Sequence, residues 1–352
     1  MNKNAFDYLI VGQGLAGSVL SYLLINEGNK IIIIDHFNEN SSSQVAAGLV
    51  NPVTGRRVVK SWMADTLIPF AENFYHTIES KFGEQFYFPL DAVEVIHTVK
   101  DLNEWTSRID EQGMNQYFLK KVSEKLYKDK ISEFKKLIRI SSSAWMNIPL
   151  LIKLCRIEFN KSALLLKEVF DHSKLKIEKD YIEYGIYKCK KIIFCEGYKS
   201  LYNPLWNWLP FVPAKGEILL IVCKDLPEDF ILLSGLYIIP VGNHHFRVGS
   251  TYEWNFINEQ PTEKGKLKLL ALLNNILKIP FEIIEHRAGV RPTVKDRRPL
   301  IGQHPDQKNI YIFNGFGTKG VQLTPFFADY FIKFLDGKVR LMEEIDIMRF
   351  YK

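Results

Sequence analysis

The sequence predicts an α/β protein in which a domain built on a parallel sheet is joined to a second, mainly antiparallel β-sheet domain. Three observations carry this prediction. The chain opens with a strand, a glycine-rich turn, a helix and a second strand in close succession. Strand-like segments with alternating polarity fill two stretches further along the chain. Its 352 residues are also enough for two domains, each with its own hydrophobic core.

The opening segment predicts a Rossmann-like unit that binds a dinucleotide. An apolar strand at residues 6–11 leads into a G-x-G-x-x-G turn that contains Gly12, Gly14 and Gly17. Gly12 permits the tight turn, and Gly14 lets the backbone approach a pyrophosphate. Gly17 allows the following helix, at residues 16–26, to lie close to the strand.

The ends of the helix and of the second strand complete this prediction. The backbone at Leu15 and Ala16 begins the helix, whose N-terminal N–H groups and dipole favour a negatively charged phosphate. The second strand, at residues 31–34, ends at Asp35, and His36 follows it. An acid at this spacing is typical of a ligand for ribose hydroxyls.

Hydrophobic periodicity predicts the remaining elements and the domain boundaries. Helices are expected at 62–82, 149–160, 263–277 and 325–335, and strands at 92–99, 175–178, 181–187, 191–195, 217–223, 236–241 and 245–249. This order predicts that both domains are assembled from separated segments. The dinucleotide domain is expected to comprise 1–85, 141–210 and 286–352, and the second domain 86–140 and 211–285.

Composition narrows the class of protein. No apolar run approaches the ~18 residues that a membrane span requires. The four cysteines form no C-x-x-C pair and the eight histidines show no metal-ligand spacing, so we expect reduced thiols, a cytoplasmic location and no metal site. A net charge of +6 is modest for this length and is typical of a lysine-rich solvated surface.

Further motifs follow in a fixed order along the chain. They are Cys195-Glu196-Gly197 after a strand, Pro213-Ala214-Lys215-Gly216-Glu217, Tyr237-Ile238-Ile239-Pro240, Gly289-Val290-Arg291-Pro292-Thr293, Asp296-Arg297-Arg298-Pro299 and Asn314-Gly315-Phe316-Gly317-Thr318-Lys319-Gly320. This ordered set resembles the FAD-dependent D-amino-acid oxidase superfamily, in particular its glycine oxidase and sarcosine oxidase-like branches. The resemblance covers almost the whole chain.

The resemblance implies FAD as the cofactor and assigns residues to it. The implied cofactor-binding residues are Gly12, Gly14, Leu15, Ala16, Gly17, Asp35, His36, Ala46, Ala47, Gly48, Glu196, Gly197, Gly315, Gly317, Thr318, Lys319 and Gly320. Glu196 departs from the family, which has Ala-Thr-Gly at this loop. No cysteine lies near Arg291 or Gly315, so we expect the FAD to be bound non-covalently.

The implied reaction is oxidation of the C–N bond of a small amine or amino acid by hydride transfer to the flavin. Such a site needs a cation for the substrate carboxylate, and the planar fork of arginine serves this best. Arg291 matches the arginine that binds the carboxylate in the family; the alternative is an ion pair with Asp296. Tyr237 matches a substrate-facing tyrosine, or it packs in the sheet. Lys319 lies near the flavin or substrate, or it caps the glycine loop.

Three alternatives remain open from the sequence. The electron acceptor is O₂ in an oxidase and another molecule in a dehydrogenase. A relative that modifies tRNA at a carboxymethylaminomethyl-type group shares the fold and would bind nucleic acid. A flavin-binding protein without turnover is the third alternative, and only Glu196 supports it.

Overall fold

The computed structural model describes residues 4–54, 58–109, 111, 113–118 and 121–351, and these form two compact units. The first unit comprises 1–44, 148–214 and 290–352, and the second comprises 45–147 and 215–289. Residues 45–85 and 141–147 therefore group with the second unit, whereas the sequence predicts them in the dinucleotide domain. The reason is backbone pairing, because Gly48 and Val50 bond to Met146 and Ala144.

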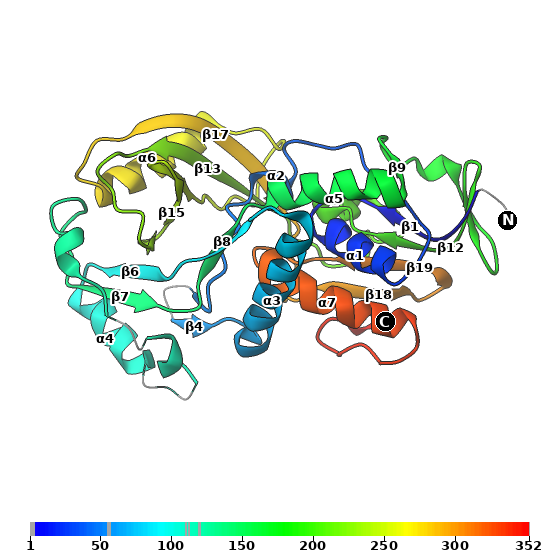
Figure 1. Cartoon of the computed structure of the whole chain (residues 1–352), viewed down its shortest axis with the longest axis horizontal. Coiled ribbons are helices and arrows are strands. Elements are labelled where there is room, and N and C mark those ends of the chain that lie inside the picture. The colour runs from blue at the N-terminus through cyan, green and yellow to red at the C-terminus, as the bar shows by residue number, and fades with distance from the viewer. Residues whose placement is uncertain (1–3, 55–57, 110, 112, 119–120, 352) are drawn as a thin grey trace. The chain divides into compact units, whose positions relative to one another are not determined.

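The first unit contains an eight-stranded sheet with helices packed on it (Figure 1). Its strands are β1 (Ala5–Val11), β2 (Ile31–Ile34), β9 (Leu164–Leu166), β10 (Leu175–Ile177), β11 (Ile182–Tyr184), β12 (Tyr187–Phe194), β18 (Leu300–His304) and β19 (Gln307–Asn314). Its helices are α1 (Leu15–Asn26), α5 (Ile148–Ser162) and α7 (Gly320–Leu335), with 3₁₀ turns at His172–Lys174, Gly197–Tyr202 and Ile347–Phe350. A short helix, α2 (Ser42–Val45), ends at the boundary with the second unit.

Most strands of this sheet are parallel. The neighbours β9, β2, β1 and β12 are parallel, and β19 is parallel to the final residues of β12. Antiparallel β10 and β11 extend the sheet beside the first half of β12, and β18 pairs antiparallel with β19. α1 packs against both α5 and α7, which is why it is apolar on most of its circumference.

The second unit is built on a seven-stranded sheet of order β17-β13-β16-β15-β14-β6-β7. These strands are β6 (Ala92–Ile96), β7 (Lys136–Ile140), β13 (Ala214–Val222), β14 (Ile231–Leu233), β15 (Tyr237–Gly242), β16 (His245–Gly249) and β17 (Glu282–Arg291). Two smaller sheets pair β3 (Val53–Thr54) with β4 (Val59–Lys60) and β5 (Tyr87–Pro89) with β8 (Ala144–Met146). The helices are α3 (Ala64–Phe82), α4 (Val99–Ile109) and α6 (Glu263–Ile276), with 3₁₀ turns at Asn115–Tyr117 and Glu124–Leu126.

The two faces of this seven-stranded sheet bury different cores. Side chains alternate along each strand, so Val93 and Val95 face one core while Ala92 and Ile96 face the other. Helix α6 covers the first face and α4, through Trp105, covers the second. The sheet is mainly antiparallel, as predicted, and β14 and β6 form a parallel pair.

Two sequence predictions on composition can be compared with the fold. All four cysteines are buried and free. Among the helices in the described ranges, none is long and apolar enough to cross a membrane.

Candidate functional site

The predicted glycine loops meet at one edge of the first unit's sheet. Each loop follows directly after a strand, and the three strands, β1, β12 and β19, are parallel neighbours. Val11 at the end of β1 pairs with Phe194 at the end of β12, and Phe194 pairs with Ile312 near the end of β19. The carboxyl ends of parallel strands are where open α/β sheets bind ligands.

The first glycine loop leaves no room for side chains. A Cβ atom on Gly17 would lie 1.9 Å from the Gly12 carbonyl oxygen, and one on Gly12 would lie 2.6 Å from the carbonyl oxygen of Cys195. Gly12 also has a φ of +99°, which favours glycine. The first and second loops are therefore in backbone contact, as a cradle for a pyrophosphate requires.

The start of α1 is suited to an anion. Its first turn holds no acidic side chain, and its N-cap, Gly14, contributes no side chain. The backbone N–H of Leu15 donates to the hydroxyl of Ser43 over 3.0 Å. Ser43 thus orders the turn without adding charge, and the dipole of the helix remains available to a phosphate. The residues present fit the pyrophosphate of a dinucleotide.

Asp35 lies where a ribose-binding acid is predicted and is held by the backbone. Its Oδ2 accepts the N–H of Gln13 over 2.6 Å, and its Oδ1 accepts the N–H of Phe37. A carboxylate has about four acceptor positions, so both oxygens can still accept ribose hydroxyls. His36 is exposed, with its Nε2 3.4 Å from the Nζ of Lys199.

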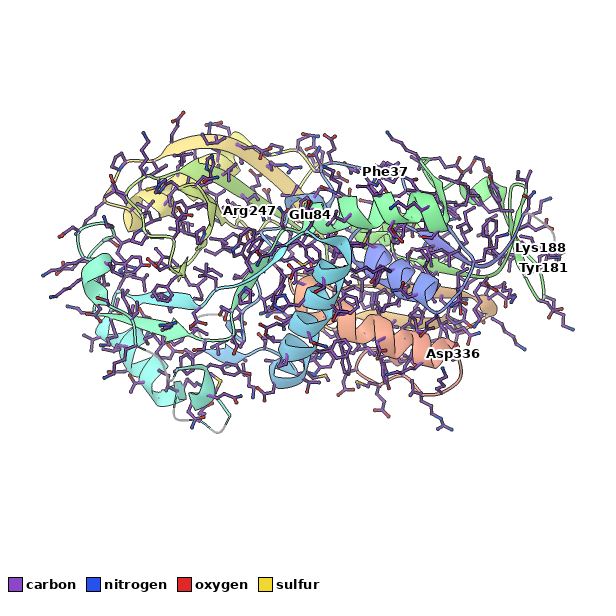
Figure 2. All side chains as sticks on the ribbon, viewed as in Figure 1. Phe37, Glu84, Tyr181, Lys188, Arg247 and Asp336 are labelled. Carbon is purple, nitrogen blue, oxygen red and sulfur yellow. The ribbon has the colours of Figure 1, made fainter. Side chains whose placement is uncertain are left out.

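Arg156 is a residue of this region that the sequence reasoning missed. Its Nε donates to Gln13 Oε1 over 2.9 Å, and its guanidinium lies 3.6 Å from the centre of the ring of Phe37. Phe37 is labelled in Figure 2. Arg156 therefore contacts both the first glycine loop and Phe37, which comes two residues after Asp35. No short motif reports such a contact, because Arg156 comes from α5, 143 residues away from Gln13.

Asn314 connects the second and third loops and was also missed as a site residue. Its Nδ2 donates to the carbonyl of Gly197 and to the hydroxyl of Ser200, both over 2.8 Å. Its Oδ1 accepts the N–H of Gly315 over 2.8 Å. An asparagine directly before a glycine loop is the only sequence signal of this role. The predicted residues Gly197 and Gly315 are thereby brought together.

The third loop leads into α7. Gly315 needs to be glycine, because a Cβ atom there would lie 2.9 Å from the backbone nitrogen of Leu300 and its φ is +76°. At the start of α7, a Cβ on Gly320 would come within 3.4 Å of the Leu15 side chain, so the first turns of α7 and α1 are neighbours. Thr318 is exposed, and burial lowers the pKa of Lys319 to about 8.

Arg291 ends β17 and belongs to the first unit. It is half-buried, and its carbonyl accepts the N–H of Thr293 over 2.9 Å. The carboxylate of Asp296, the acid considered as an alternative partner of Arg291, bonds to Arg349 Nε over 2.9 Å and to the backbone of Arg298.

Tyr237 and the segment Ala46–Gly48 lie in the second unit. Tyr237 pairs with Gly249 across β15 and β16, and a Cβ on Gly249 would lie 2.6 Å from the phenol oxygen. Because Gly249 has no side chain, the phenol ring of Tyr237 can lie over it on the sheet. Gly48 has a φ of +77°, and a Cβ there would lie 2.0 Å from the carbonyl oxygen of Met146.

Glu196 is half-buried in the second loop of the first unit. Its Oε2 accepts from Asn203 Nδ2 over 2.8 Å and from Ser200 Oγ over 3.4 Å. Burial outweighs these bonds and raises the pKa of Glu196 from 4.5 to about 7. The carboxyl group of Glu196 is therefore protonated, and uncharged, through much of the acidic pH range.

Glu196→Gln is expected to stabilise the protein at pH 8 and to leave it nearly unchanged at pH 4.5. Because the pKa of Glu196 is raised in the folded state, its contribution to the free energy of unfolding is complete below pH 4.5. That contribution is lost as pH rises through about 7. The variant, which is always neutral, should gain at most about 3 kcal/mol above pH 7. Denaturant unfolding at several pH values measures this, and an equal difference at every pH would contradict the assignment.

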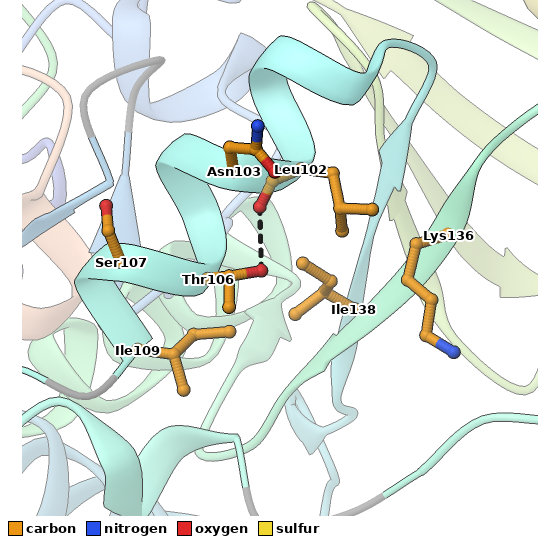
Figure 3. A pocket seen from close by; sticks show the side chains of 7 residues that line it. All are labelled: Leu102, Asn103, Thr106, Ser107, Ile109, Lys136 and Ile138. Carbon is orange, nitrogen blue, oxygen red and sulfur yellow. Dashed lines mark hydrogen bonds between the residues drawn. The ribbon is translucent and has the colours of Figure 1, made fainter.

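A separate hollow of about 650 Å³ lies in the second unit between α4 and β7 (Figure 3). Its lining is Leu102, Asn103, Thr106, Ser107, Ile109, Lys136 and Ile138. Lys136 already pairs with Glu124 over 3.4 Å, and the hydroxyl of Thr106 donates to the carbonyl of Leu102. The hollow therefore brings together no acid–base pair and none of the predicted site residues.

The chain is similar in sequence and in fold to known proteins. The family model described as "FAD dependent oxidoreductase" matches residues 7–333. A glycine oxidase of Pseudomonas aeruginosa is 24% identical over 90% of this chain and 91% of its own. The crystal structure of glycine oxidase from Bacillus cereus superposes with a TM-score of 0.79 at 18% identity, covering 95% of this chain and 96% of that one. A bifunctional tRNA 5-methylaminomethyl-2-thiouridine biosynthesis protein of Marinomonas is 22% identical over 96% of this chain and 57% of its own.

Proposed function

We propose that this chain, which belongs to the family of FAD-dependent oxidoreductases, oxidises the C–N bond of a small amino acid or amine whose carboxylate binds Arg291. The protein is an enzyme of that family and FAD is its cofactor. When bound, FAD supplies the acceptor for the hydride that leaves the carbon beside the nitrogen. We propose that FAD is held non-covalently and that the protein, with its four buried thiols, is cytoplasmic.

The observation that carries the proposal is the meeting of three glycine loops in the unit that also contains Arg291 and Lys319. The first two loops meet through the backbone of Gly12 and Cys195, and Asn314 bonds the second loop to the third. Arg291 contributes a guanidinium that can bind a carboxylate through two parallel hydrogen bonds. Tyr237 is proposed as a tyrosine that faces the substrate.

Anaerobic mixing of the FAD-loaded protein with a panel of amino acids and N-methylated amines tests this proposal. Loss of the oxidised-flavin absorption near ~450 nm reports the reaction directly, because the cofactor itself accepts the hydride. Arg291→Met should lower the second-order rate of flavin reduction by about 100-fold or more, since two charge-assisted hydrogen bonds are lost. FAD content should be unchanged.

Arg297→Met is the matched control, because Arg297 is an exposed arginine six residues away. The substrate should reduce the flavin of Arg297→Met at the wild-type rate. If the substrate reduces the flavin of Arg291→Met at the wild-type rate, Arg291 does not bind the substrate carboxylate. If no amino acid or amine reduces the wild-type flavin, the proposed reaction itself is wrong.

A second candidate function is oxidation of a carboxymethylaminomethyl-type group on tRNA. The likeness to the Marinomonas protein favours it, although this chain spans only 57% of that protein's length. Flavin reduction by tRNA that carries the group, with binding that weakens as salt concentration rises, would support this function over the first.

A further inference from the structure

Gln13, in the glycine turn after β1, lies at the centre of a hydrogen-bond network within the first unit. Gln13 is 2% exposed, and both ends of its amide are bonded. Its Nε2 donates to the hydroxyl of Ser18 on α1 over 3.3 Å and to the carbonyl of Ile152 on α5 over 3.2 Å. Its Oε1 accepts from the Nε of Arg156, also on α5, over 2.9 Å. Two helices therefore hold the first glycine loop through one side chain.

The backbone of Gln13 extends this network to Asp35. The N–H of Gln13 donates to Asp35 Oδ2 over 2.6 Å, and the N–H of Phe37 donates to Asp35 Oδ1. An aspartate that accepts the N–H two residues later closes a tight turn. Within this turn, Phe37 has a φ of +58°, which is uncommon for a residue other than glycine. Such a conformation persists only where the surroundings hold it.

Arg156 provides this support for Phe37. Its guanidinium lies 3.6 Å from the centre of the Phe37 ring, which is a cation–π contact, whereas the Nζ of Lys167 lies 5.7 Å away. Burial lowers the pKa of Arg156, and the carboxylate of Asp35 counteracts part of this effect. Arg156 thus contacts both of the residues whose N–H groups hold Asp35, Gln13 by a hydrogen bond and Phe37 through its ring.

We propose that Arg156 is a positioning residue for the ADP half of FAD. It holds the predicted pyrophosphate loop through Gln13, and it holds the predicted ribose-binding acid, Asp35, through Phe37. The planar guanidinium suits this double role, because its edge donates a hydrogen bond while its face packs on an aromatic ring. The inference rests on the assignment of this loop and of Asp35 to FAD, and it does not depend on which amine the enzyme oxidises.

Binding of FAD and of ADP to the full chain freed of cofactor tests the proposal. FAD is titrated by flavin fluorescence, and ADP is measured by its competition with FAD. In Arg156→Met, the dissociation constants of both should rise by about 10-fold or more, because a hydrogen bond from a charged group and a ring contact are lost. Arg156→Lys keeps the charge without the planar fork, so it should recover only part of the affinity.

A double substitution tests whether Arg156 acts through Gln13. Gln13→Leu removes the amide that accepts the hydrogen bond from Arg156, and it should also weaken FAD binding. Residues in one hydrogen-bond network do not contribute independently. The loss of FAD affinity in Gln13→Leu/Arg156→Met should therefore be smaller than the product of the two single losses.

Two controls separate this role from a purely structural one. When saturated with FAD, Arg156→Met should keep the wild-type flavin spectrum and reduction potential, because the isoalloxazine ring is at the other end of the cofactor. A variant with a distorted domain would change both. Lys153→Met, the matched control, removes an exposed cation from the same helix and should bind FAD and ADP as the wild type does.

The proposal would be overturned by wild-type FAD affinity in Arg156→Met, by weaker FAD binding without weaker ADP binding, or by an equal loss in Lys153→Met. Single losses that multiply in the double variant, or an altered flavin spectrum at saturation, would also overturn it. The proposed function fails by a different result, namely a flavin that no amine reduces. The two failures are distinguishable, because FAD and ADP binding are measured with no amine present.

Discussion

Gly17→Ala is expected to lower FAD affinity by about 10- to 100-fold and to destabilise the protein by about 1–3 kcal/mol. The added Cβ would lie 1.9 Å from the Gly12 carbonyl oxygen, less than any real contact permits. The carbonyl oxygen belongs to the backbone and the position of the Cβ atom is fixed by the backbone of α1, so α1 has to move away from the loop. That movement withdraws the N-terminus of the helix from the phosphate position. Flavin fluorescence titration and denaturant unfolding measure the two effects.

The matched control is Gly28→Ala, at the end of α1. Gly28 has a φ of +84°, and a Cβ atom there would meet nothing within 4 Å. The variant should therefore lose about 1 kcal/mol of stability through backbone strain alone and should bind FAD normally. If Gly17→Ala binds FAD as tightly as Gly28→Ala does, the cradle at the first loop does not hold the cofactor.

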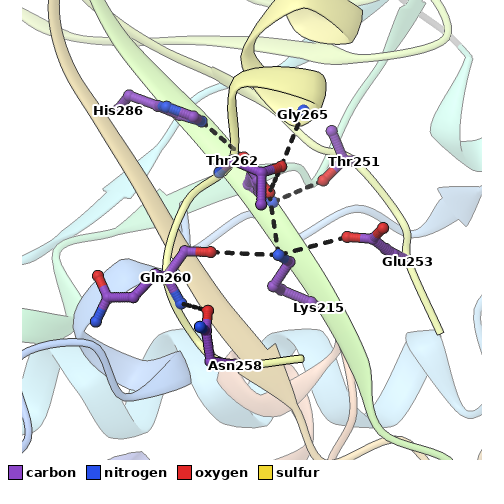
Figure 4. Close-up of polar contacts among 9 residues, drawn as sticks. Lys215, Thr251, Glu253, Asn258, Gln260, Thr262, Gly265 and His286 are labelled. Atoms are coloured by element: carbon purple, nitrogen blue, oxygen red, sulfur yellow. Dashed lines mark hydrogen bonds and ion pairs between the residues drawn. The ribbon is translucent and has the colours of Figure 1, made fainter. Parts of the chain in front are cut away.

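Glu217→Gln is expected to cost about 3–5 kcal/mol of unfolding free energy. Glu217 is 1% exposed and Lys215 2% exposed, and their charged atoms lie 3.3 Å apart in the second unit. The Glu217 carboxylate also accepts from His286 Nε2 over 2.8 Å and from the backbone and hydroxyl of Thr262 (Figure 4). A neutral amide leaves Lys215 with less compensation and presents an N–H group to these donors. Denaturant unfolding at pH 7 measures the loss.

Two further measurements make this prediction specific. Glu111→Gln removes an ion pair with Arg108 in which both side chains are exposed. It should lower the free energy of unfolding by less than about 1 kcal/mol. The hydrogen bonds and Lys215 keep the pKa of Glu217 below 4.5 despite its burial. The contribution of Glu217 is therefore present above pH 4.5 and lost as pH falls through the folded-state pKa. A cost that persists undiminished below that pKa would contradict this account.

The parts of the fold that local backbone chemistry determines could be predicted from the sequence. The first strand, glycine turn, helix and second strand agree with prediction to within about a residue at most ends, because Gly12 and Gly17 are required by conformation and close packing. The sequence predicts a helix that begins at Pro325, whereas α7 begins five residues earlier, at Gly320. A proline inside a helix gives no signal that distinguishes it from one at the start.

Features set by distant contacts could not be predicted. Helix α4 is an exception: Leu102, Trp105 and Ile109 recur at helical spacing, so the pattern is present in the sequence although no helix was predicted there. The contacts of Arg156 and Asn314 depend on partners from other elements. The boundary at residues 45–85 was misplaced for the same reason, since it depends on pairing with β8, about 100 residues later.

The division of the chain has a consequence for biosynthesis. The chain passes between the units four times, because the first unit has three segments and the second has two. The last segment supplies β19, which covers the edge of β12, and α7, which packs on α1. While the ribosome is still making this segment, β12 exposes an unpaired edge and α1 an apolar surface. Such a nascent chain is open to aggregation and to chaperones until its final residues emerge.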